Sequence, residues 1–188
     1  RCCHGMGNSI ILDPYDVYRM TTGMGKSMQE LLAASVELNV VDGVILPNLK
    51  MQGAEEACAY LDGEGRCSIH PYRPGICRLF PLGRYYENGG FSYFLQTGEC
   101  AKENRSKIKV SKWIDTPDLT RNQQFTLQWH DLLHAMEERL TGEDEGKQRE
   151  ENLLLLRLFY LLPYEGTIDF YTQFTERMEH WNGQNGQI

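Results

Sequence analysis

The residues of this chain best suited to chemistry are its six cysteines: Cys2, Cys3, Cys58, Cys67, Cys77 and Cys100. Thiolate sulfur binds zinc and iron, and four thiolates suit either a tetrahedral zinc ion or an iron–sulfur cluster. No two of these cysteines have the C-x₂-C spacing of a zinc ribbon or a bacterial ferredoxin. The residue type therefore points to a metal centre more strongly than the spacing does.

Disulfides and buried structural thiols are the two alternatives to metal binding for these cysteines. A disulfide framework is typical of small secreted chains that cannot build a hydrophobic core. This chain has 188 residues and 41% hydrophobic content, which is enough for a core. Buried structural thiols could account for one or two cysteines, Cys58 being the best case, but not for six. Metal binding is therefore the leading hypothesis.

The stretch Glu64–Pro81, EGRCSIHPYRPGICRLFP, contains Cys67 and Cys77. Its prolines, Pro71 and Pro74, fix φ and remove backbone donors, so this loop should be stiff. A stiff loop loses less conformational entropy when its thiols gather around a metal. We therefore expect this loop to present two of the ligands.

Two arginines, Arg73 and Arg78, lie on either side of Cys77. A centre with four thiolate ligands carries net negative charge, which nearby guanidinium groups would offset. The alternative is that both arginines form surface ion pairs, which contribute little to stability. We expect Arg73 and Arg78 to lie beside the bound cofactor.

Four histidines are further candidates for ligands: His4, His70, His130 and His134. His4 and His70 each lie near a cysteine, but a histidine beside a ligand loop more often contacts solvent or the ligands than the metal. His130 and His134 are spaced i,i+4 on a predicted helix, yet HDLLH lacks the glutamate of the HExxH motif. A partly solvated helix flank is the favoured interpretation of this pair.

Composition excludes two classes of partner. The formal net charge is −7, whereas a general nucleic-acid binder normally shows a basic face. The longest apolar run, Leu153–Leu162, is interrupted by Arg157 and followed by Pro163. Because a membrane helix needs about 20 apolar residues, we expect no membrane span.

Short elements are expected to position the cysteines in the first part of the chain. Asp13-Pro14 predicts a helix start, and Ser27 with Glu30 predicts a capping box that opens a second helix. Gly75 to Phe80 is expected to form one helical turn. Strands are predicted in Val40–Gln52, with breaks at Gly43 and Pro47, then over Ala57–Leu61, and as a hairpin over Leu82–Tyr86 and Phe91–Gln96.

Helical patterns dominate the second part. A helix is predicted from Thr116 to Leu140, a buried element over Leu153–Leu162 and an amphipathic helix over Asp169–Trp181. The predicted fold class is α+β. It consists of a cysteine-cluster, metal-binding region over residues 1–115 and a helical region over residues 116–188 packed on it as one compact domain.

Five segments together match a known pattern: Cys2-Cys3, Asp13-Pro14-Tyr15-Asp16, Cys58-Ala59-Tyr60-Leu61-Asp62, the run from Gly65 to His70, and the run from Tyr72 to Pro81. In this combination they resemble the YkgJ-type cysteine-cluster family, whose members are described as zinc- or iron-chelating. Flagellin lysine methylases look related to the same group. The resemblance covers about residues 2–100, and the R-P-x-x-C-R-x-F-P block is its most specific part.

The resemblance implies a bacterial or archaeal cytoplasmic protein with a cysteine-bound metal, often called an iron–sulfur protein. The positions that match the recurring ligands best are Cys3, Cys58, Cys67 and Cys77, and those that match less closely are Cys2 and Cys100. The family commonly has another C-x-x-C ahead of the adjacent pair, and this sequence does not contain it. The number of metal centres therefore stays open.

We accordingly expect a metal-binding protein that holds an iron–sulfur cluster or Zn²⁺ through cysteine thiolates, and the resemblance favours iron–sulfur slightly. One alternative is an enzyme that modifies a protein or peptide, for example by methyl transfer. Another is a structural zinc module for protein contacts. In both alternatives the expected partner is a protein or peptide.

Overall fold

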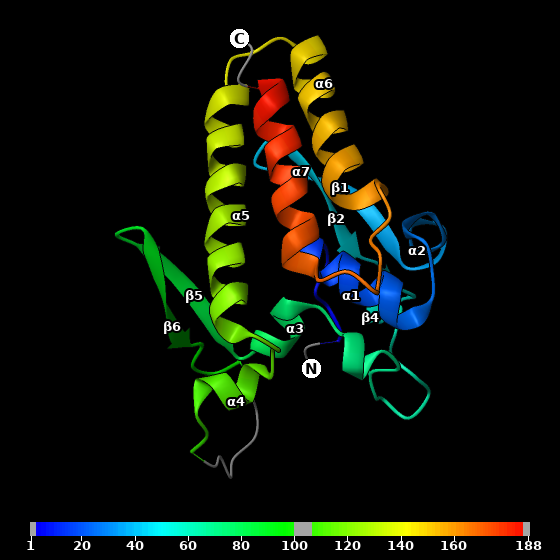
Figure 1. Ribbon diagram of the computed structural model, residues 1–188. Helices are drawn as coiled ribbons and strands as arrows, with labels where there is room; N and C mark the ends of the chain where they lie inside the picture. The colour runs from blue at the N-terminus through cyan, green and yellow to red at the C-terminus, as the bar shows by residue number, and fades with distance from the viewer. Residues whose placement is uncertain (1–2, 100–106, 186–188) are drawn as a thin grey trace.

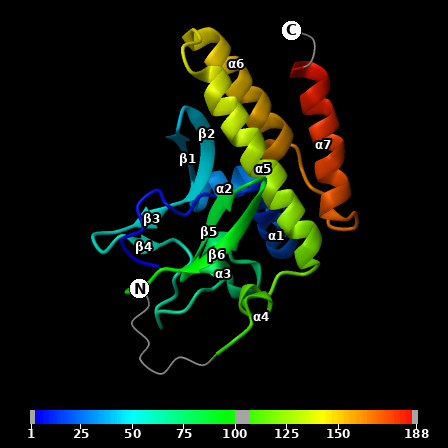
Figure 2. The same cartoon turned by 90° about the vertical axis from the view of Figure 1, so that its left-hand side faces the viewer.

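A computed structural model describes residues 3–99 and 107–185 of the chain. The predicted α+β class is confirmed, because short antiparallel strand pairs fill the first half and long helices the second. Figure 1 shows α5, α6 and α7 standing side by side, with the smaller elements α3, α4 and β4 at their lower end. Figure 2 gives the same arrangement from the side. No helix in the described part of the chain is both long and apolar enough to cross a membrane.

The first two helices follow their predicted caps. Helix α1 spans Pro14–Met24, and the Asp13 side chain accepts a hydrogen bond from the backbone N–H of Asp16. Helix α2 spans Met28–Ala34, and its capping box joins Ser27 and Glu30 in both directions. These side chains satisfy N–H groups that a helix start leaves without partners.

The strands begin earlier than the sequence indicates. Strand β1 spans Val36–Val41 and pairs antiparallel with β2, Val44–Leu49, with Val36 opposite Leu49. Pro47 does not break β2: it lies within the strand, and its carbonyl accepts a hydrogen bond from the Leu12 N–H. A proline is tolerated there because the position needs no donor.

The remaining strands are short and frame the cysteine segments. Strands β3 (Met51–Gln52) and β4 (Ala57–Cys58) pair over two residues each. The predicted strand over Ala57–Leu61 is therefore too long, because the Leu61 N–H turns back to the Cys58 carbonyl. The predicted hairpin is confirmed as β5 (Leu82–Glu87) and β6 (Gly90–Leu95).

The helical half contains two features that sequence patterns do not indicate. Helix α4 (Val110–Ile114) was not predicted, and α5 spans Leu119–Leu140, so it begins three residues later than expected. Asp118 caps α5 in the left-handed region, at φ 47°. The predicted buried element is divided between the end of α6 (Glu145–Leu156) and a π-helical turn, Arg157–Leu161. Helix α7 spans Phe170–Asn185.

One hydrophobic core joins residues of both halves. Helix α5 has an apolar stripe, in which Phe125, Trp129 and Met136 are buried. The ring of Phe125 meets those of Phe170 and Phe174 edge-on, at centroid distances of 5.0 and 4.8 Å. Residues from α1 and β2 belong to the same core. The elements that carry the cysteines are therefore supported by the helical half.

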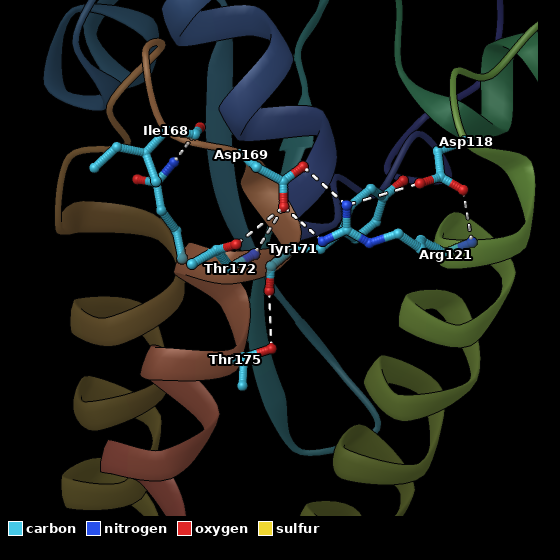
Figure 3. Close-up of polar contacts among 8 residues, drawn as sticks. Asp118, Arg121, Ile168, Asp169, Tyr171, Thr172 and Thr175 are labelled. Atoms are coloured by element: carbon cyan, nitrogen blue, oxygen red, sulfur yellow. Dashed lines mark hydrogen bonds and ion pairs between the residues drawn. The ribbon is translucent and has the colours of Figure 1, made fainter.

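Side-chain contacts join the start of α7 to the start of α5 (Figure 3). Arg121 reaches across and places Nη2 2.6 Å from Oδ2 of Asp169, and its guanidinium lies 4.6 Å from the centroid of the Tyr171 ring. Asp169 also accepts a hydrogen bond from the Thr172 N–H at 3.1 Å, so it caps the helix. This pairing fixes where α7 begins against α5.

Candidate metal centre

Cys3 and Cys58 lie on adjacent backbone segments although 55 positions separate them in the sequence. The Cys58 N–H donates to the Cys3 carbonyl at 2.8 Å, and His4 forms an antiparallel bridge with Ala57. On its other side, Cys58 is opposite Met51 in the β3–β4 pair. The fold therefore brings the first described cysteine next to the second.

A turn between Leu61 and Cys67 brings Cys67 back beside the segment that contains Cys58. Leu61 forms an isolated antiparallel bridge with Cys67, and the Leu61 N–H donates to the Cys58 carbonyl at 2.9 Å. Asp62 closes the turn, because its Oδ1 accepts hydrogen bonds from the N–H groups of Glu64 and Arg66 at 2.9 and 2.8 Å. Three cysteine-bearing segments thus meet through backbone contacts.

Helix α1 holds the loop that leads to Cys77. A 3₁₀ turn spans His70–Tyr72, and α3 spans Gly75–Leu79, which confirms the predicted helical turn. The Gly75 N–H donates to Oδ1 of Asp16 at 2.7 Å. The ring of Tyr72 lies so close to Gly23 that a Cβ there would meet it at 2.3 Å.

The sequence pattern marks Asp16 only as part of a helix start. The structure shows a second role. The Asp16 carboxylate completes the capping box of α1 and also accepts a hydrogen bond from the backbone N–H of Gly75, in the loop that leads to Cys77. The spacing D-P-x-D signals only the first of these. The contact with Gly75 joins positions 59 apart, which no local pattern reports.

The carboxyl group of Asp16 is buried, with 3% of the residue exposed. Burial raises its pKa to about 6 from an ordinary value of 3.8, although the Gly75 and Asp13 N–H groups and Arg84 favour the ionised form. Burial, followed by the charge of Asp16, also raises the pKa of Asp13. The carboxyl pair at the start of α1 is thus easier to protonate in the folded chain than in the unfolded one.

This shift predicts a pH dependence of stability. Because the folded pKa exceeds the unfolded one, Asp16 stabilises the fold below about pH 4, and this contribution disappears as the pH rises through 6. Its size is about 3 kcal/mol at most. Asp16→Asn keeps an acceptor for Gly75 and removes the titration, so urea unfolding at pH 4 to 7 should show a flatter profile for the variant. Parallel profiles for the two proteins would contradict this prediction.

The four described cysteines are half-buried, and three of them, Cys58, Cys67 and Cys77, pack against the hydrophobic core. No disulfide joins these four cysteines to one another. Within residues 3–99 and 107–185, no group of three or more Cys, His, Asp or Glu side chains is gathered closely enough for a metal ion. The predicted ligands Cys2 and Cys100 lie outside the described residues. The backbone therefore brings cysteine-bearing segments together, while a complete donor set is not seen among these side chains.

The two predicted arginines differ in environment. Arg73 is half-buried, and its Nη1 lies 3.4 Å from Nδ1 of the exposed His70. Arg78 is 5% exposed, and its guanidinium lies 5.9 Å from the Tyr15 ring centroid. Neither Nε nor Nη1 of Arg78 has a hydrogen-bond partner among the described residues. Of these two arginines, Arg78 is therefore the one that presents a buried, unsatisfied positive group.

The other candidate histidines differ in their surroundings. His4 is exposed. The ring of His130 stacks on that of Tyr86 at a centroid distance of 3.8 Å, and Nδ1 of His134 lies 3.5 Å from Glu137. These positions agree with the interpretation of His130 and His134 as a partly solvated helix flank.

Comparison with known proteins identifies the family. The model of one protein family, described as "CxxCxxCC: Putative zinc- or iron-chelating domain", matches residues 1–101. The chain belongs to this family. The resemblance inferred from the cysteine segments is thereby confirmed. No curated protein and no solved structure matches the chain.

The chemistry of the site fits the group that the CxxCxxCC family description names. Thiolates are ligands for zinc and for iron–sulfur clusters, and such centres are negatively charged. Arg78 directly follows Cys77 and has two buried donor nitrogens, Nε and Nη1, without acceptors in the described chain. An anion nearby would stabilise a buried guanidinium of this kind. Among the described residues, Cys3, Cys58, Cys67 and Cys77 have thiol groups of the kind that such a centre uses.

Proposed function

We propose that the protein binds a metal through Cys3, Cys58, Cys67 and Cys77, with Cys2 and Cys100 as additional candidates. The observation that carries the proposal is the backbone contact between cysteine segments distant in sequence, above all the hydrogen bond from Cys58 to Cys3. Folding alone brings these segments together, so fewer degrees of freedom remain to be lost on metal binding. Membership of a family described as zinc- or iron-chelating supports the same function.

An iron–sulfur cluster is proposed slightly ahead of zinc. Four thiolates suit either group, and the preference comes from the resemblance to cysteine-cluster proteins that are often called iron–sulfur proteins. The arginines Arg73 and Arg78 are proposed to offset the charge of the centre, with Arg78 the better placed because it is buried. When bound, a zinc ion would stabilise the fold, whereas a cluster would add electron transfer.

The deciding experiment is anaerobic purification followed by metal and acid-labile sulfide analysis and a visible spectrum. Brown protein with iron and sulfide would support the cluster, and colourless protein with stoichiometric zinc would support the zinc site. Protein that takes up neither zinc nor iron, when zinc or iron together with sulfide is offered anaerobically to the reduced chain, would refute the proposed function.

A structural zinc module that mediates protein contacts is the second candidate. The observation that favours it is the outer face of the β5–β6 hairpin, where Tyr85 is 59% exposed and Phe94 is 47% exposed. Large exposed aromatic residues at neighbouring positions are typical of contact surfaces. Zinc content together with a protein partner that is lost on Tyr85→Ser substitution would favour this candidate over a redox cluster.

The described structure offers less support for an enzyme. Two cavities, of about 780 and 740 Å³, lie along α5 and α7. Their lining includes Gln128 and Thr175 but no cysteine. An enzyme acting at the metal would need a cavity that opens beside the thiolates.

A further inference from the structure

Helices α5 and α7 line a long groove that the candidate metal centre does not use. The cavities of about 780 and 740 Å³ adjoin in this groove, since Gln128 and Thr175 line both of them. The two helices run in the same direction along its sides (Figure 1). On α5 the lining extends from Arg121 to Arg139, a length of about 27 Å at 1.5 Å per residue. The groove is therefore as long as a helix of about 18 residues.

The floor of the groove is apolar. It includes buried side chains that belong to the hydrophobic core, namely Phe125, Leu132, Met136, Phe174 and Trp181. Two further apolar lining residues, Leu127 and Met178, are partly exposed, and Ala135 is exposed. A helix that lies in such a groove contacts it through apolar side chains spaced i, i+3, i+4 and i+7. The flexible side chain of Met178 can adapt to the shape of such a partner.

The rim of the groove is acidic. Its exposed residues include Asp131, Glu176 and Glu179. Asp131 has the Nδ1 atom of His130 at 3.3 Å, whereas neither glutamate forms an ion pair within the described part of the chain. The buried Arg177, next to Glu176 in the sequence, donates its hydrogen bonds to three backbone carbonyls instead. The two glutamates can therefore pair with a cation from another molecule.

The arginines that line the groove do not neutralise this rim. Arg121 places Nη2 2.6 Å from Oδ2 of Asp169 (Figure 3), and Arg139 places Nη2 2.7 Å from Oε2 of Glu151. Their carboxylate partners, Asp169 and Glu151, are not part of the groove lining. The charge that the groove presents to a ligand is therefore negative, and electrostatic complementarity favours a cationic partner.

We propose that this groove binds a cationic amphipathic helix of another protein, with its apolar side chains on the floor and its lysine or arginine side chains at the acidic rim. The proposal goes beyond the proposed function, because no cysteine lines the groove and the contact needs no metal. A second copy of this chain fits less well. Its formal net charge is −7, so it would bring further carboxylates to a rim that is already acidic.

The probe for this proposal is a fluorescein-labelled synthetic helix of about 18 residues, with leucines on one face and lysines on the other. Its binding to the purified chain is followed by fluorescence anisotropy at low and at high salt. We expect binding that weakens as salt screens the exposed charges, and much weaker binding of a peptide with the same composition in scrambled order. Equal binding of the two peptides, or no binding of the helical one, would overturn the proposal.

Substitutions on the rim test the charge. The double variant Glu176→Gln, Glu179→Gln should weaken binding by about 2- to 30-fold at low salt, the range for two exposed ion pairs. The matched control is Glu87→Gln with Glu150→Gln, which makes the same change in net charge at exposed positions of β5 and α6 outside the groove. Equal weakening in both double variants would reduce the binding to a general attraction and would overturn the proposal.

A substitution in the groove tests the binding surface. An indole in Ala135→Trp would occupy space that the peptide needs, so binding should fall by about 10-fold or more. Thr120→Trp, at an exposed position of α5 outside the groove, should bind as wild type does. Thermal unfolding checks that each variant folds. Unchanged binding by Ala135→Trp would overturn the proposal, and so would a concentration-dependent dimer of wild type, seen by sedimentation, that Ala135→Trp abolishes.

Discussion

Cys67→Ser should abolish metal binding while leaving the metal-free fold almost intact. Serine is nearly the same size as cysteine, so the bridge between Leu61 and residue 67 and the following 3₁₀ turn should persist. A serine hydroxyl is not ionised near neutral pH, whereas the thiolate is the form that binds the metal. We expect the metal-to-protein ratio, measured by elemental analysis after anaerobic purification, to fall close to zero.

The same substitution should remove the stabilisation that the metal provides. A ligand at 100 times its dissociation constant stabilises the folded state by about 2.7 kcal/mol, and this increment should vanish in the variant. Ser68→Ala is the matched control, because the neighbouring hydroxyl is exposed and donates only to the Tyr60 carbonyl. Full metal content in Cys67→Ser would show that Cys67 is not a ligand. Loss of metal in Ser68→Ala would show that any substitution in this loop disturbs metal binding, so that the effect is not specific to the thiol.

Arg177→Met should cause the largest loss of stability in the helical half, about 3–5 kcal/mol in the free energy of unfolding. The guanidinium satisfies three carbonyls where α6 and the π-helical turn end, at Leu158, Leu162 and Pro163. It also lies 3.6 Å from the Tyr164 ring centroid. Methionine fills a similar volume but leaves these carbonyls without a donor, and buried acceptors without partners are costly.

Denaturant unfolding at neutral pH measures this loss. Arg157→Met is the matched control, because Arg157 is exposed on the same π-helical turn, and its replacement should change stability by less than about 0.5 kcal/mol. Similar effects of the two substitutions would show that the carbonyl contacts of Arg177 contribute little. Arg177→Lys should recover only part of the stability, because one ammonium group cannot reproduce the fork of donors.

Local features of the fold were predictable because their causes are local. The capping box of Ser27 and Glu30 and the two-residue turn Asn88-Gly89 depend on residues adjacent in sequence. At Asn88 and Gly89, φ is 52° and 70°, the left-handed region that these residue types tolerate best. The α5 stripe was predictable for the same reason, since a helical period of 3.6 residues needs no information from elsewhere.

The errors arose where distant contacts decide the structure. Pro47 lies inside β2, where Leu12, from another part of the chain, donates a hydrogen bond to its carbonyl. The later start of α5, at Leu119, has a local cause instead: the residue before Pro117 avoids helical angles, and Asp118 adopts a left-handed conformation. At the candidate site, the cysteine types and the two arginines were visible in the sequence. The different burial of Arg73 and Arg78 was not, since it depends on what packs against α3.

The shared core bears on whether the region that matches the family could be separated from the later helices. The family match ends at residue 101, yet Leu12 within that region accepts a hydrogen bond from the hydroxyl of Tyr160 at 3.0 Å. Tyr15 likewise packs against Phe125 and Phe170 from the later helices. The cysteine region thus has apolar faces that it does not cover itself. A gene fusion or domain transplant that moved only residues 1–101 would need another polypeptide to shield them, a role that the later helices have in this chain.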